Sequence, residues 1–78
     1  MALTEVGKFL RKLRLENGEI LKNMAEKLEV SSAFLSAVEN GKKKLPQTTK
    51  NKIINLYNLM EVEKHKFERA IIETESVI

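Results

Sequence analysis

Residues 24–42 read MAEKLEVSSAFLSAVENGK, and this stretch decides the fold. It predicts two short helices, one over about Leu21–Glu29 and one from Ser31 or Ser32 to Asn40. Apolar residues recur on one face of each helix, a serine can cap the second one, and Asn-Gly gives its stop signal. A link of only about two residues forces the helices to cross steeply, which leaves the second helix on the outside of the domain.

Helical spacing predicts three more helices, over about Thr4–Asn17, from Thr48 or Thr49 to Asn58, and from near Glu61 onward. Because β-branched residues do not alternate with polar ones, no strand is predicted. The fold class is therefore all-α, with five short helices around one small core. The residues expected to face that core are Val6, Phe9, Leu10, Leu13, Leu21, Met24, Ala25, Leu28, Phe34, Leu35, Val38, Ile53, Leu56, Tyr57, Met60, Phe67, Ala70, Ile71 and Thr74.

The composition excludes several classes of function. With 78 residues, 42 % of them hydrophobic and 32 % charged, the chain suits one small globular domain with a thin core. Cysteine is absent and His65 is the single histidine, so we expect no disulfide, thiolate nucleophile, metal site or cofactor. No catalytic residues are expected, and an enzyme is disfavoured. No apolar run is long enough to span a bilayer, and a cytoplasmic location is expected.

Positive charge is concentrated in one part of the sequence. Residues 1–45 hold nine basic and six acidic side chains, whereas residues 46–78 hold five of each. Residues 40–52 carry five lysines and no acid, namely Lys42, Lys43, Lys44, Lys50 and Lys52. Such a run is typical of a phosphate-binding edge, but also of a solvated loop, and charge alone does not decide between them.

The quoted stretch resembles the helix-turn-helix of the Cro/repressor (XRE-like) family, whose pattern is L-A-x-x-L-G-V-S-x-x-x-[LIV]-S-x-x-E-x-G-[KR]. Arg14 and Gly18 also stand where the family places an arginine and a turn glycine, and the similarity extends over about Val6–Met60. The resemblance implies a compact, lambda-repressor-like domain of five helices. In this family the third helix enters the major groove of DNA.

The resemblance also implies roles for particular residues. The positions that match base-facing residues are Ser32, Ala33, Ser36 and Ala37. The positions that match phosphate contacts are Lys22, Asn40, Lys42, Lys43 and Lys44. Glu39 is expected to form an ion pair with Arg14, which would tie the first helix to the third.

Two features set the chain apart from the family pattern. Leu21 stands where many members have glutamine, so Lys22 is the expected phosphate donor at this helix. Glu29 stands where many have glycine, and we expect the turn to relax rather than to strain this residue. The small base-facing residues also predict sparse direct readout, because serine and alanine cannot make bidentate contacts with bases. Operator choice would then depend on water, DNA shape and half-site spacing.

The expected function is sequence-specific binding of double-stranded DNA by a transcriptional regulator, a repressor of the phage or mobile-element type. So small a domain is expected to bind a palindromic operator as a twofold homodimer. Residues 1–60 would form the DNA-binding domain, and residues 61–78 a C-terminal helix that extends it and serves dimerisation. The apolar residues that suggest this are Ile71, Ile72, Val77 and Ile78.

A protein of another class stays open as an alternative. An antitoxin-like module would bind DNA with its N-terminal part and a partner protein with its C-terminal helix.

Overall fold

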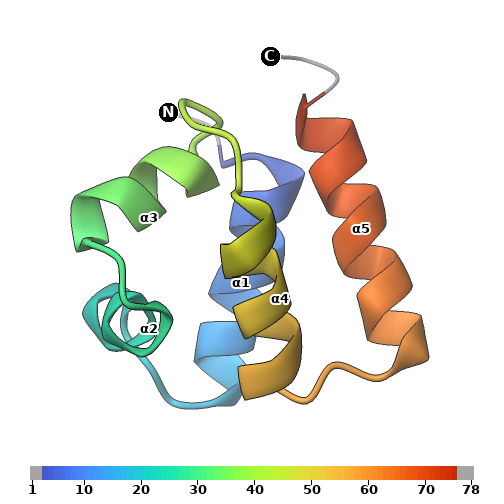
Figure 1. Ribbon diagram of the computed structural model, residues 1–78, viewed down its shortest axis with the longest axis horizontal. Helices are drawn as coiled ribbons and strands as arrows, with labels where there is room; N and C mark the ends of the chain where they lie inside the picture. The colour runs from blue at the N-terminus through green and yellow to red at the C-terminus, as the bar shows by residue number, and fades with distance from the viewer. Residues whose placement is uncertain (1–2, 76–78) are drawn as a thin grey trace.

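Residues 3–75, described here by a computed structural model, form five helices and no strand (Figure 1). The all-α prediction is therefore confirmed for this part of the chain. The helices are α1 (Glu5–Glu16), α2 (Leu21–Leu28), α3 (Ser32–Glu39), α4 (Gln47–Leu56) and α5 (Glu61–Glu75). Val77 and Ile78, which the sequence suggested as dimer contacts, lie outside the described residues.

Helix α1 organises the packing, since it contacts α2, α3 and α5. Its first turn is capped by the Thr4 hydroxyl, which accepts a hydrogen bond of 3.1 Å from the Gly7 amide. The Thr74 hydroxyl of α5 accepts another from the Val6 amide, also at 3.1 Å and buried. One side of α1 therefore carries α5, which is part of the same core rather than an appendage.

A single apolar cluster fills the space between the helices. Phe67 of α5 is fully buried, and its ring stacks on Phe9 of α1 with centroids 4.8 Å apart. The buried apolar residues are Val6, Leu10, Leu13, Met24, Ala25, Leu28, Leu35, Val38, Ile53, Leu59, Phe67 and Ala70.

The predicted core was wrong at the end of α4. Leu56 and Met60 are 50 % and 73 % exposed, and Leu59 is buried in their place. Helical spacing fails here because α4 ends at Leu56 and Asn58 adopts a left-handed backbone conformation (φ 50°). The chain turns at that residue, and a different side chain points inward.

Helices α2 and α3 cross steeply, since α2 is seen nearly end-on in Figure 1 while α3 runs across the view. The turn between them did not relax as expected: Glu29 is left-handed, with φ 60° and ψ 39°. Such a conformation costs a residue with a Cβ about 1 kcal/mol or more. Lys52 of α4 supports the turn by donating to the Glu29 carboxylate at 2.9 Å and to the Leu28 carbonyl at 3.4 Å.

The start of α1 lies against the end of α3. The Thr4 amide and hydroxyl both donate to the Glu39 carbonyl, at 3.2 Å and 2.8 Å. Gly7 also faces this carbonyl, and a Cβ at Gly7 would overlap it. The two backbones can therefore approach this closely only because residue 7 is glycine.

We predict that Gly7→Ala lowers the free energy of unfolding by about 1–3 kcal/mol, because overlap with backbone is not relieved by a side-chain rotation. Arg11→Ala, at an exposed position of the same helix, serves as the control and should change it by less than about 0.5 kcal/mol. Urea denaturation measures both. Equal stability of the two variants would contradict the close approach.

A polar cluster joins the α1–α2 turn to the end of α4. The carboxylate of Glu19 accepts a 2.6 Å hydrogen bond from the Tyr57 hydroxyl and forms an ion pair with Lys27, whose ammonium lies 5.3 Å from the centre of the Tyr57 ring. Burial favours the neutral form of Glu19. The hydrogen bonds from Lys27 and Tyr57 and the charges of Lys27 and Arg14 outweigh it, so the pKa of Glu19 is lowered.

This cluster predicts a loss of stability in acid. Because the pKa of Glu19 is lower in the folded state, its contribution is present above its ordinary pKa of 4.5 and is lost as the pH falls through the folded-state value. Between about pH 7 and about pH 3, the wild-type protein should therefore lose more stability than Glu19→Gln. Urea midpoints across this range measure the difference, and parallel curves would contradict the prediction.

Candidate nucleic-acid interface

Helix α3 turns its small side chains outward. Ser32 and Ala33 are exposed, Ser36 and Ala37 are half-buried, and Leu35 on the opposite side is fully buried. The helix begins where the sequence predicts, because the Ser31 hydroxyl accepts a 3.0 Å hydrogen bond from the Phe34 amide. The four residues expected to face bases are thus at least partly accessible, and none of the four has a long side chain.

Arg14 and Glu39 form the ion pair that the resemblance implied. Only 7 % of Arg14 and 5 % of Glu39 is exposed. Arg14 Nη1 donates to Glu39 Oε2, Arg14 Nη2 donates to Glu39 Oε1 at 3.3 Å, and Nη1 also lies 3.7 Å from the Met24 sulfur. This two-pronged pair fixes the last turn of α3 against α1 and α2, and so fixes which side of α3 faces outward.

We predict strong coupling between these two residues. Arg14→Met and Glu39→Met should each lower the free energy of unfolding by about 3 kcal/mol or more, because each leaves a buried charge unpaired. The double variant should lose far less than the sum, since two methionines fill the site without charge. Urea denaturation of all four proteins gives the coupling energy. Additive losses would contradict it, and a double variant that folds where a single variant does not would support it.

The connection after α3 carries three consecutive lysines, and residues 41–45 are called the lysine loop below. Gly41 is left-handed (φ 76°), and the Lys42 and Lys43 amides both donate to the Ala37 carbonyl, at 2.8 Å and 3.3 Å. These bonds close the end of α3 and fix the position at which the loop leaves the helix. The side chains of Lys42, Lys43 and Lys44 are exposed.

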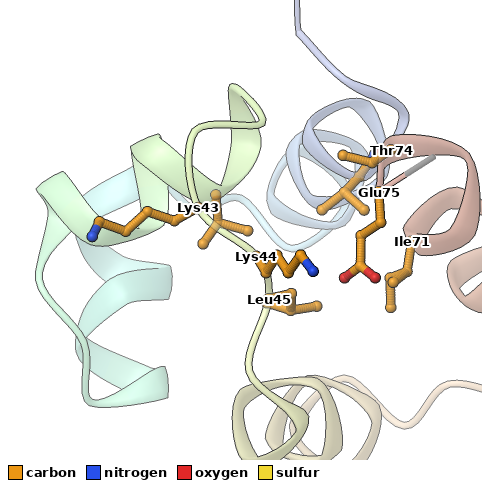
Figure 2. A pocket seen from close by; sticks show the side chains of 8 residues that line it. Lys43, Lys44, Leu45, Ile71, Thr74 and Glu75 are labelled. Carbon is orange, nitrogen blue, oxygen red and sulfur yellow. The ribbon is translucent and has the colours of Figure 1, made fainter. Parts of the chain in front are cut away.

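The lysine side chains do not all point the same way. Figure 2 shows Lys43 extending along α3, whereas Lys44 turns toward Glu75 at the end of α5. Beneath the loop lies a cavity of about 10 Å³, room for about one water molecule. The residues that line it are Val6, Val38, Lys43, Lys44, Leu45, Ile71, Thr74 and Glu75. The last turns of α5 therefore lie next to the lysine loop, on the other side of this cavity.

Two of the five lysines in the basic run form ion pairs with acids of the same chain. Lys50 pairs with Glu68 at 3.3 Å, and Lys52 pairs with Glu29. Sequence reasoning missed both pairs, because their acids lie 18 and 23 residues away along the chain. The positive field is thus narrower than the sequence suggested, and it is centred on the lysine loop.

Lys22 and Asn40 lie at opposite ends of the two crossing helices. Lys22 is exposed in the first turn of α2. Asn40 uses its amide group within the protein, donating to the Ser36 carbonyl at 2.9 Å. Asn40 therefore acts as an end cap of α3, in addition to its predicted place beside phosphate.

Among residues 3–75 no group of three or more histidine, cysteine or acidic side chains could hold a metal ion. Within the same residues, no helix has the length and apolar character to cross a membrane. Comparison with protein-family models, curated proteins and solved structures finds no match to this chain.

Proposed function

We propose that this chain binds double-stranded DNA in a sequence-specific manner, with α2 and α3 as a lambda-repressor-like helix-turn-helix and α3 in the major groove. The observation that carries the proposal is the juxtaposition of an outward α3 surface made of small side chains with the exposed lysine loop that continues it. The small residues allow the α3 backbone to approach base edges, and the lysines neutralise phosphates beside the groove. Lys22 adds a cation at the start of α2.

In this proposal the protein is a cytoplasmic repressor of the phage or mobile-element type that binds a palindromic operator as a twofold dimer. Direct readout is limited to single hydrogen bonds from Ser32 and Ser36 and to apolar contacts of Ala33 and Ala37 with thymine methyl groups. Shape and half-site spacing supply the remaining specificity. Selection of bound duplexes from a random pool should therefore return two short, loosely defined half-sites with a fixed spacing.

Removal of the three lysines tests the proposal. Lys42→Ala/Lys43→Ala/Lys44→Ala should weaken binding to all duplexes by about tenfold or more at about 0.1 M salt, and should reduce the slope of log K against log salt by up to about 3. Fluorescence anisotropy of a labelled duplex measures both quantities.

The matched control removes three cations of α5, as Lys64→Ala/Lys66→Ala/Arg69→Ala. It has the same net charge as the loop variant and should keep the wild-type slope. Equal slopes for the two triple variants would remove the lysine loop from the interface and overturn the proposal.

A second candidate function is binding of a partner protein through α5, as in an antitoxin-like module. The observation that favours it is a pair of adjoining hollows between α1 and α5, of about 260 Å³ and 120 Å³, which share Phe9, Lys12 and Lys66. Both hollows have an apolar floor, and their edges carry charges of both signs, so they suit a partner segment with an apolar anchor and charged residues on either side of it. The charged lining residues are Glu5, Lys8, Lys12, Glu16, Glu63 and Lys66. This function is supported if a partner protein co-purifies with the chain at fixed stoichiometry. The double variant Lys12→Glu/Lys66→Glu should then release that partner while DNA binding is unchanged.

A further inference from the structure

The last turn of α5 carries an acid that faces the lysine loop. Glu75 and Lys44 line the same cavity of about 10 Å³. Figure 2 shows the Lys44 ammonium turned toward the Glu75 carboxylate, whereas Lys43 extends the other way, along α3. Neighbouring lysines of the loop therefore have different surroundings. One lies beside an acid of the same chain, and the other follows the helix that is proposed to enter the groove.

The acids that precede Glu75 in the second half of α5 have partners elsewhere. Glu68 pairs with Lys50 of α4 at 3.3 Å, and Glu73 pairs with Arg69, one turn earlier in α5, at 3.6 Å. Neither of these two acids lines the cavity under the lysine loop. The negative charge that α5 brings to this cavity is therefore that of Glu75.

The backbone is held in place on both sides of the cavity. The buried Thr74 hydroxyl accepts a hydrogen bond of 3.1 Å from the Val6 amide, which ties the last turn of α5 to the start of α1. The Lys43 amide donates to the Ala37 carbonyl at 3.3 Å, which holds the residue before Lys44 at the end of α3. The two charged side chains thus start from fixed positions on opposite sides of a small cavity.

We propose that Glu75 competes with DNA phosphates for Lys44 and so limits the affinity of the lysine loop for nucleic acid. The inference rests on the proposed function, since it names a residue that regulates the phosphate contacts of that site. Lys44 and Glu75 are both exposed, so a phosphate can reach the ammonium and displace the carboxylate.

The electrostatic reason is that one cation has two possible anionic partners. A lysine contributes to DNA affinity because it neutralises a phosphate and releases the counterions of that phosphate. A carboxylate beside the lysine already balances part of its charge and repels the approaching phosphate, so the contribution of Lys44 is reduced. Because phosphates carry no base information, Glu75 should weaken binding to every sequence by the same factor.

Removal of the acid tests the proposal, with fluorescence anisotropy of a labelled duplex at about 0.05 M salt as the measurement. Glu75→Gln should tighten binding about two- to fivefold, the range expected for one exposed charge interaction. Glu16→Gln is the matched control with the same net charge. Glu16 is exposed in the last turn of α1, about 15 Å along the helix from Val6, which lines the cavity. The control should tighten binding by less than about 1.5-fold, because salt screens its charge at that distance.

Variants of the two lysines make the test specific. In the wild-type background, Lys43→Ala should cost more affinity than Lys44→Ala. In the Glu75→Gln background the two losses should become similar, because Lys44 is then free for phosphate. In the Lys44→Ala background, Glu75→Gln should tighten binding no more than Glu16→Gln does. Circular dichroism should show unchanged helix content in all variants, since every substituted side chain is exposed.

Three results would overturn the proposal. They are a gain for Glu75→Gln that does not exceed the control, an equal gain in the absence of Lys44, and a loss of affinity, which would make Glu75 a support of the loop rather than a competitor.

Heparin, an anionic polymer without bases, separates the proposal from the proposed function. A chain that binds heparin with this dependence on Glu75, but binds no duplex, would refute the function and leave Glu75 as the competitor for Lys44. A chain that binds duplex DNA regardless of Glu75 would refute only the role of Glu75. A chain that binds neither polymer would overturn both.

Discussion

The attachment of Glu39 to α1 is the constraint on which the site depends. This residue is held twice, through its carbonyl by Thr4 and through its carboxylate by Arg14. Gly7 lets the two backbones come close enough for the first contact. A buried ion pair contributes little net stability, but it has one good geometry, and loss of either partner is costly. Helix α3 is short, so the position of its last turn fixes the direction of its outer surface.

The two ends of the domain have different chemistry. The small residues of α3 and the lysine loop form a polar, basic edge that suits an anionic polymer. Most of the large apolar side chains that are exposed among the described residues lie at or next to other helix ends, namely Leu15, Ile20, Leu56, Met60 and Val62. The end of α5 belongs to the basic edge, because Ile71, Thr74 and Glu75 line the cavity under the lysine loop.

Local signals in the sequence predicted most of the fold. The five helices could be located because their signals depend only on neighbouring residues. These signals are the apolar spacing, the capping residues Thr4 and Ser31, and the glycines that end helices. The Arg14–Glu39 contact spans 25 residues, and it was accessible only through the family pattern. The small outward residues of α3 could also be assigned, because the position of Leu35 on the buried side determines which residues face away.

Other features could not be predicted from local sequence patterns. The left-handed Asn58 moved Leu59 into the core and Leu56 out of it. Glu29 keeps a strained turn because Lys52 reaches it from α4, a contact that no local pattern encodes. The cluster of Glu19, Lys27 and Tyr57 joins three separate elements. At Glu29 a distant side chain outweighs a local preference, whereas at the end of α4 the left-handed Asn58 interrupts the helical spacing.

Titration of isotopically labelled protein with duplex DNA, followed by amide chemical shifts, tests the central claim most directly. The duplex should carry a selected half-site. The account predicts that the largest changes fall in three places: α3, the lysine loop and the first turn of α2. The amides of α5, except those of its last turn, should change little. Changes concentrated in α5, or spread evenly over the surface, would contradict the claim that α3 enters the groove.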